Sequence, residues 1–341
     1  MKFISDSNFV KFLESLKKDY TVYVPVKKEN QRFYKKYTGF SKDIVIGEVR
    51  AFEPLKAFFT RARETVVEDF KFEVPHSKDR PIAIVGVKAC DLKGFKVLDY
   101  VFKNNDYQDP FYLKNREQNL IISADCTCAI DTCFCLAVGV NPYPEENFDI
   151  NISKVRGGYI LEVGSQKGRD IVDRKSNLFQ SARKELISER DNTRNKVAEE
   201  IEKNIKENNI PNQELFKDII KRNFKSNIWE DEAKTCVECG ACNAVCPTCH
   251  CFLLYDQKDA EKMTRLRVWD SCMIKDFARV AGGANPRPKL WMRLRNRFEK
   301  KFDFFSKVAD IYACTGCGRC ILACPARIDI RKVLSRLVKN G

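Results

Sequence analysis

The chain has 341 residues, 44% apolar content, 16 cysteines and a formal charge of +14, so it can form two or three domains with apolar cores. Charged residues interrupt every apolar run before about 18 residues, and the N-terminus MKFISDSNFVKFLESLKK lacks a signal-peptide pattern, so neither a membrane span nor a secretory leader is predicted. We therefore expect a cytoplasmic protein whose reduced thiols bind metal instead of forming disulfides.

The first domain, residues 1–165, is predicted to be α/β. Runs of apolar residues with strand character alternate with segments whose apolar positions recur at helical spacing, which is typical of an open sheet with helices on its faces. In chain order we expect a helix capped by Ser5, Asp6 or Ser7, strands over 21–26 and 81–87, a helix over 91–102, and strands over 119–123 and 157–163.

Five cysteines belong to this domain, one at a strand-to-helix junction and four in the loop DCTCAIDTCFC. They are Cys90, Cys126, Cys128, Cys133 and Cys135. Buried structural thiols are common in protein cores, but five thiols at such density favour a third iron–sulfur cluster. The spacing does not say which of the five is the spare thiol.

A charged helical connector is predicted over residues 166–230. The stretch SARKELISERDNTRNKVAEEIEKNIKENN alternates charges along a helical pattern, and NQELFKDIIKRNF is typical of another helix. Alternating charge indicates a solvated helix that separates two domains.

The third domain, residues 231–341, contains the run C-x2-C-x2-C-x3-C-P twice. This spacing is typical of a ferredoxin with two 4Fe-4S clusters, in which three close cysteines wrap one cluster and the fourth binds the other. A zinc site prefers two separated C-x2-C pairs, and a third cysteine so near the second fits it poorly. The predicted ligands are Cys236, Cys239, Cys242 and Cys324 for the first cluster, and Cys314, Cys317, Cys320 and Cys246 for the second. Gly240, Gly316 and Gly318 suit loops that approach the cluster sulfides closely.

Residues 247–313 separate the two runs and must fold back so that the runs meet. We expect helix on both sides of a break at Gly282, Gly283 and Pro286. The basic side chains here predict a solvated face or a docking surface for an acidic partner, because no aromatic stacking pattern supports nucleic-acid binding. They are Arg287, Lys289, Arg293, Arg295, Arg297, Lys300 and Lys301.

Three cysteines remain beside one of the two histidines. Cys249, Cys251 and Cys272 could hold a fourth cluster together with His250, but we expect them to pack beside the ferredoxin-type pair, with His250 next to the ligands and not among them. His76 is expected on the surface. No G-x-G-x-x-G follows a strand and no P-loop occurs, so flavin and nicotinamide sites are expected on partner subunits.

Clusters also change the charge balance. Three clusters at about −2 each would lower the formal charge by about 6 to roughly +8. Part of the basic excess is therefore expected to balance buried negative charge.

An ordered set of motifs resembles one family across nearly the whole chain. The segments are GVKACDLKGFKVLD, TCFC, CVECGACNAVCPTCHCF, RVWDSC, AGGANPRP and CTGCGRC followed by CP. They resemble a family of iron–sulfur subunits that comprises the beta subunits of cytoplasmic NiFe sulfhydrogenases and the corresponding iron–sulfur subunits of anaerobic sulfite reductases. The resemblance implies that Cys90, Cys126, Cys133 and Cys135 hold the third cluster, so that Cys128 is the spare thiol and departs from the family pattern.

The same resemblance implies an electron-transfer subunit without a catalytic site of its own. A FAD subunit would exchange electrons with NAD(P)H, and a separate hydrogenase module would make or oxidise hydrogen. FEPLKAFF and IWEDEAKTC are closer to the hydrogenase branch than to the anaerobic sulfite reductase branch, which is the second hypothesis. Two further hypotheses are a subunit of a thiol-, disulfide- or polysulfide-reducing complex, and a nucleic-acid protein with a structural cluster.

Overall fold

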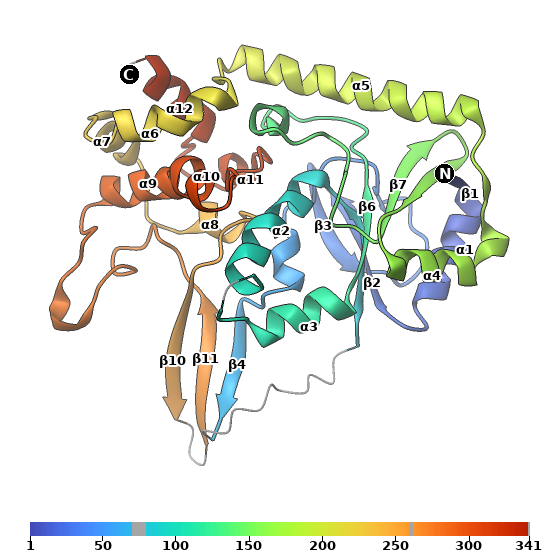
Figure 1. Ribbon diagram of the computed structural model, residues 1–341, viewed down its shortest axis with the longest axis horizontal. Coiled ribbons are helices and arrows are strands. Elements are labelled where there is room, and N and C mark those ends of the chain that lie inside the picture. Colours follow the sequence, from blue (N-terminus) through green and yellow to red (C-terminus); the bar gives the residue numbers. More distant parts are fainter. Residues whose placement is uncertain (70–79, 105, 259–261, 340–341) are drawn as a thin grey trace.

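An eight-stranded mixed sheet organises the N-terminal half of the chain (Figure 1). The structure, a computed structural model, describes residues 1–69, 80–104, 106–258 and 262–339; His76 lies outside them. The strand order is β3-β2-β5-β6-β7-β8-β1-β9, in which β2, β5, β6 and β7 run parallel. The strands are β1 (Lys2–Ser5), β2 (Thr21–Lys28), β3 (Gln31–Lys36), β5 (Ile82–Val87), β6 (Leu120–Ala124), β7 (Ile150–Val155), β8 (Gly158–Val163) and β9 (Gln180–Ser181).

Helices cover both faces of this sheet because successive side chains of a strand point to opposite sides. On β5, Ala83 and Val85 pack with the core of helices α1 and α4, whereas Ile84 and Val87 pack with that of α2 and α3. The four helices are α1 (Asp6–Leu16), α2 (Ala89–Phe102), α3 (Pro110–Gln118) and α4 (Gln166–Arg174). The predicted N-terminal sheet with helices on its faces is thus confirmed, including its first helix, whose N-cap is Ser5. It extends beyond the expected end at residue 165, because α4 packs on it and β9 belongs to it.

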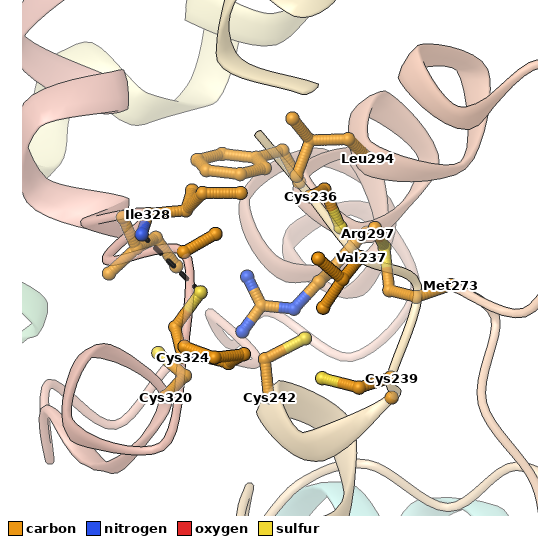
Figure 2. A pocket seen from close by; sticks show the side chains of 15 residues that line it. Cys236, Val237, Cys239, Cys242, Met273, Leu294, Arg297, Cys320, Cys324 and Ile328 are labelled. Atoms are coloured by element: carbon orange, nitrogen blue, oxygen red, sulfur yellow. Dashed lines mark hydrogen bonds between the residues drawn. The ribbon is translucent and has the colours of Figure 1, made fainter. Parts of the chain in front are cut away.

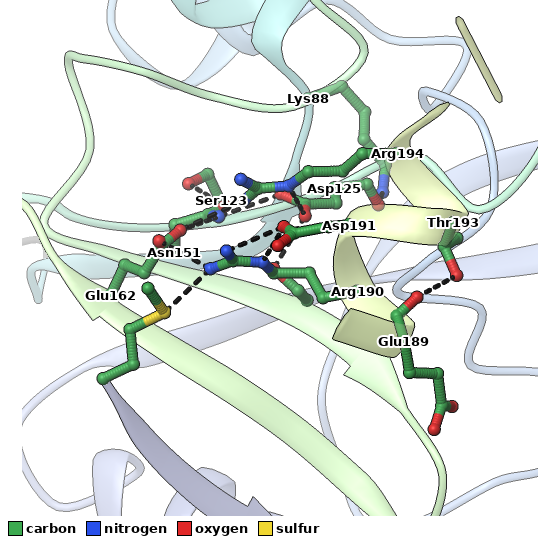
Figure 3. Close-up of polar contacts among 12 residues, drawn as sticks. Lys88, Ser123, Asp125, Asn151, Glu162, Glu189, Arg190, Asp191, Thr193 and Arg194 are labelled. Carbon is green, nitrogen blue, oxygen red and sulfur yellow. Dashed lines mark hydrogen bonds and ion pairs between the residues drawn. The ribbon is translucent and has the colours of Figure 1, made fainter. Parts of the chain in front are cut away.

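The long helix α5 (Lys184–Glu207) runs along the molecule from the sheet to the C-terminal helices (Figure 1). Arg194 donates to Asp125 and Glu162, and Arg190 donates to Glu162, which fixes α5 to the sheet (Figure 3). The face with Val197 and Ile201 is buried in the same core as the C-terminal helices. The helix is therefore solvated on one side only.

The insert between the two cysteine runs contains strands where we expected helix. Strand β11 (Met263–Trp269) pairs with β10 (Phe252–Lys258) and with β4 (Arg63–Glu68), and the three form a second sheet. Arg267 of β11 is buried because it pairs with Glu64 and Asp109. The helix expected from residue 267 to the glycine break was wrong: residues 267–269 belong to β11, whose conformation depends on pairing with β4, and residues 270–280 form turns and irregular structure.

The helix expected after the break is confirmed as α9 (Leu290–Glu299), and it continues into a π-helix, η6 (Lys300–Phe304). The apolar core against which α9 and η6 pack includes Trp229, Phe298, Phe302 and Leu334. No helix among the described residues is long and apolar enough to span a membrane. The other C-terminal helices are α6 (Phe216–Arg222), α7 (Ile228–Ala233), α8 (Ala241–Ala244), α10 (Phe305–Val308), α11 (Arg319–Leu322) and α12 (Ile330–Lys339).

Candidate metal centre

Two N-terminal cysteines lie together because the carboxyl ends of parallel strands meet at one edge of the sheet. Cys90 lies in the first turn of α2, directly after β5, and Cys126 follows the neighbouring strand β6. Lys88 crosses between the two strand ends, where its ammonium donates to the carbonyl of Asp125 at 3.0 Å and to that of Ile46 at 2.7 Å. The sheet thus positions two thiols before the cysteine loop begins.

The cysteine loop brings three further thiols to the same cavity. The lining of this cavity includes all five N-terminal cysteines and also Cys317 of the second ferredoxin-type run. Cys128, implied to be the spare thiol, lies at this cavity with the others. The five are Cys90, Cys126, Cys128, Cys133 and Cys135.

Burial keeps Cys90, Cys126 and Cys135 protonated when no metal is present. It raises the pKa of Cys126 to about 12 and holds the pKa values of Cys90 and Cys135 well above their usual range. A metal centre must therefore displace their protons and supply the positive charge that stabilises the thiolates. Four or more thiols around one enclosed cavity fit such a centre.

The first ferredoxin-type set surrounds a second cavity. Its lining includes Cys236, Cys239, Cys242 and Cys324, as expected, and also Cys320 (Figure 2). The backbone N–H of Ile328 donates to the Cys324 sulfur at 3.3 Å. Such amide donors stabilise negative charge on a sulfur and fit a bound cluster.

Gly240 lets the loop of this first set turn tightly. Its φ is +72°, and a Cβ there would lie 3.0 Å from the Cβ of Ser271. The left-handed conformation and the close neighbour both favour glycine.

The second set lies between the other two cavities. Cys314 is buried near Cys317 and Cys320, and Cys246 lies near Cys320. Cys317 also lines the N-terminal cavity, and Cys320 also lines the first ferredoxin-type cavity. The three cysteine sets therefore form a continuous row with the second set in the middle.

Two glycines hold the second set against the N-terminal cysteine loop. A Cβ on Gly316 would lie 2.4 Å from the Cα of Cys135, and one on Gly318 would lie 2.2 Å from the carbonyl oxygen of Thr132. The backbone N–H of Phe134 donates to the Gly316 carbonyl at 2.9 Å. Close approach to the protein's own backbone thus favours glycine at both positions, whereas the expected approach to cluster sulfides stays a prediction.

Two cations expected on a solvated face are instead buried beside the sulfurs. The ammonium of Lys301 lies 3.2 Å from the Cys246 sulfur and donates to Thr248 and to the carbonyl of Ala313. The guanidinium of Arg297 points into the first ferredoxin-type cavity, between Cys242 and Cys324 (Figure 2). Both side chains are almost fully buried, and so is that of Arg293.

The sulfurs explain why these cations are buried. Burial acts to lower the pKa of Lys301 and of Arg297, but neighbouring thiolates outweigh burial and raise both values. Helix α9 and η6 carry the two residues on one inward face because they are four positions apart. The prediction of a solvated face was wrong for Arg293, Arg297 and Lys301, whereas the expected balance between basic residues and buried negative charge fits their positions.

The three remaining thiols lie beside the ferredoxin-type sets. The thiol of Cys249 lies beside that of Cys246, and the thiol of Cys251 lies beside that of Cys272. Asn243 donates to the Cys272 sulfur at 3.1 Å.

His250 packs next to these thiols. Its Nδ1 lies 3.0 Å from the Thr248 carbonyl oxygen, and burial lowers its pKa to about 4, so the ring is neutral. Its ring lies edge-on to those of Phe102 and Phe305.

Lys56 is a buried residue that the sequence did not single out. Its ammonium donates to the carbonyls of Asn243 and Cys249, at 3.1 and 2.8 Å, and lies over the ring of Trp269. The segment FEPLKAFF carried a family resemblance, but a lone lysine in it gives no sign of burial.

Within the described ranges, no group of three or more His, Cys, Asp or Glu residues is arranged to hold a single metal ion.

The chain is similar to known sequences over nearly its whole length. Residues 235–328 match the family described as 4Fe-4S dicluster domain. Over 335 residues, the chain is 32% identical to "Sulfhydrogenase 2 subunit beta" of Pyrococcus furiosus, and the match covers 98% of this chain and 96% of that protein. No solved structure matches.

Proposed function

The chain belongs to the sulfhydrogenase beta-subunit family, and from this premise we propose that it is the electron-transfer subunit of a multi-subunit hydrogenase. Electrons would pass between a FAD subunit that reacts with NAD(P)H and a NiFe hydrogenase module. The chain itself would hold no flavin and would catalyse no reaction on a substrate. The match over 98% of the chain favours this role over one in a sulfite reductase.

The C-terminal domain would be ferredoxin-like, with two clusters ligated as the spacing predicts. The first would use Cys236, Cys239, Cys242 and Cys324, and the second Cys314, Cys317, Cys320 and Cys246. A third would use Cys90, Cys126, Cys133 and Cys135. Each 4Fe-4S cluster supplies a site that accepts and releases one electron.

The observation that carries this proposal is the continuous row of cysteine sets. Cys317 lies at the boundary between the N-terminal and second sets, and Cys320 at the boundary between the second and first sets. This row supports a relay in which the second site is the middle station. A structural cluster would not require three sets in line.

The protein's own residues would adjust each station. Lys301 places a positive charge beside Cys246, and Arg297 places one beside Cys242 and Cys320, so both favour the more negative, reduced state. The amide of Ile328 does the same at Cys324. Cys246 is buried, which limits its contact with water.

Iron and acid-labile sulfide per chain, measured after anaerobic purification, test the proposal. We expect about 12 iron atoms in the wild type, falling toward 8 in Cys133→Ser. Cys128→Ser is the matched control, because it removes a thiol from the same cavity and should keep about 12. A value near 8 in all three proteins would leave only the ferredoxin-like pair, and a value near 16 would make Cys249, Cys251 and Cys272 ligands.

A further inference from the structure

One ligand of the first ferredoxin-type set differs from all other thiols in its exposure. The sixteen cysteines all lie in the described ranges, and Cys239 alone is exposed. Val237 beside it is 63% exposed. Ile274 is 43% exposed, and its Cδ1 lies 3.9 Å from where a Cβ on Gly240 would be. The edge of this site therefore reaches the surface through an apolar patch.

A basic segment borders this patch. Residues 274–289 contain Lys275, Arg279, Arg287 and Lys289 but only one acidic residue, Asp276. Three of the four basic side chains are exposed, and Arg287 is half-buried. Val280, which is 56% exposed, extends the apolar surface into this segment.

The segment is held beside the cysteine loop at both of its ends. Near its start, Arg293 donates to the carbonyl of Met273 at 3.1 Å, and within the segment the Lys275 carbonyl accepts from the Asn285 amide at 2.8 Å. Near its end, buried Arg293 donates to the carbonyls of Arg287 and Pro288 and pairs with Glu238 at 2.8 Å. Glu238 directly precedes Cys239, so both ends of the basic segment are fixed beside the run that contains the exposed thiol.

We propose that this surface, defined by Val237, Cys239, Ile274, Lys275, Arg279 and Val280, docks the acidic face of an electron-carrying partner protein. The inference rests on the proposed relay function and makes the first ferredoxin-type site its terminal station. An apolar centre excludes water between the two redox groups, and a rim of one charge steers an oppositely charged partner. A cluster ligand at the centre lets the electron cross where the two proteins touch.

The test uses the cluster-loaded full chain and a chemically reduced, acidic plant-type ferredoxin as the probe. Stopped-flow absorbance gives the second-order rate constant for electron transfer at low and high salt. The double variant Lys275→Glu/Arg279→Glu should lower this rate constant about tenfold or more at low salt and abolish its salt dependence. Lys203→Glu/Lys206→Glu on α5 is the matched control, since it changes the net charge equally and should change the rate less than about twofold.

A parallel measurement separates this inference from the proposed function. Dithionite should bleach the cluster absorbance of all three proteins to the same extent, because a small reductant needs no docking surface. A chain without reducible clusters would overturn the relay itself. If clusters are bleached but the two double variants behave alike, or if the ferredoxin does not reduce the wild type, the docking surface is overturned while the relay stands.

Discussion

Lys301 lies fully buried beside Cys246, where a cation is costly unless negative charge faces it. Three acceptors surround its ammonium: the Cys246 sulfur, the Thr248 hydroxyl and the Ala313 carbonyl. A bound cluster would add negative charge to this environment, so the cluster and the Lys301 ammonium would stabilise each other. The same reasoning applies to Arg297 beside Cys242.

Replacing this lysine should make the nearest site harder to reduce. Lys301→Met removes a positive charge from the reduced state, and we expect the midpoint potential of one cluster to fall by roughly 60 to 120 mV, at 59 mV per tenfold change for one electron. An EPR-monitored redox titration measures this. Lys300→Met, on the adjacent and less buried position, should shift the potential far less; equal shifts would contradict a specific role for Lys301.

The reduction of this site should not depend on pH near neutrality. Burial lowers the pKa of His250 to about 4, and the thiolates raise that of Lys301 above its usual value, so neither group titrates between pH 6 and about 8.5. Midpoint potentials at these two pH values should agree. A slope near 59 mV per pH unit would show that a proton accompanies the electron and would contradict a neutral His250.

The sign of the stability effect of His250 follows from the same shift. The unfolded chain binds a proton at His250 near pH 6.5, whereas the folded chain keeps the ring neutral down to about pH 4. The folded state is therefore favoured fully above pH 6.5, and it loses this contribution as the pH falls toward 4.

At the scale of elements, the glycine loop of the second set joins the two halves of the site. Gly316 has a φ of +64°, and its Cα faces the backbone of Cys135. The loop that contains Gly316 and the N-terminal cysteine loop cannot shift apart without breaking the hydrogen bond from the Phe134 N–H to the Gly316 carbonyl. Close packing of backbone on backbone thus fixes the geometry of both sites.

A methyl group at Gly316 should disrupt this junction. Gly316→Ala combines left-handed strain of about 1–2 kcal/mol with a backbone clash, and we expect loss of about four iron atoms together with a lower melting temperature. Gly282→Ala is the control, because Gly282 has a φ of +81° but no atom within 4 Å of its Cβ position. Equal iron loss in both variants would assign the effect to strain alone.

At the scale of the whole molecule, one buried ion pair links the sheet domain to the dicluster domain. Asp91 of α2 and Arg319 of α11 are 2.7 Å apart, and both side chains are almost fully buried. Arg319 also donates to the carbonyls of Ala51 and Glu53, and Asp91 accepts from the Leu55 amide. The two domains therefore share a desolvated polar contact as well as an apolar core.

Removing one partner of this ion pair should lower the free energy of unfolding more than removing both partners. Arg319→Met leaves the Asp91 carboxylate buried without its partner, which should lower the free energy of unfolding by about 3–5 kcal/mol. The double variant Asp91→Leu/Arg319→Met should recover part of that loss. Urea unfolding followed by circular dichroism measures both, and a double variant less stable than Arg319→Met would show that no uncompensated charge was responsible.

Much of this fold and site could be predicted from local patterns. Strand β5, helix α2 and the two cysteine runs follow from apolar periodicity and ligand spacing. Both Cys324 and Cys320 line the cavity of the run that begins at Cys236, so the cross-ligation stays a prediction. These signals lie within short stretches of chain. No comparable local signal marks β11, because its conformation depends on pairing with β4 far earlier in the chain.

The burial of Arg297 and Lys301 could not be predicted for a related reason. Basic residues at helical spacing ordinarily face solvent, and the direction of this face depends on how α9 and its π-helical continuation dock on the sulfurs. The sequence pattern also does not say which four of the five N-terminal cysteines would be ligands, and all five line the cavity. Such features depend on the assembled structure.

The sharing of Gly316 and Cys317 with the N-terminal cavity has a consequence for biosynthesis. The cysteine loop ends at Cys135, and at about 5–20 residues per second the ribosome needs roughly 10 to 40 seconds more to reach Cys317. Throughout that interval the wall of the cavity is incomplete and its thiols are open to oxygen and to other metals. The third cluster proposed for this cavity would therefore be assembled only when translation is nearly finished, or a carrier would have to shield the nascent thiols.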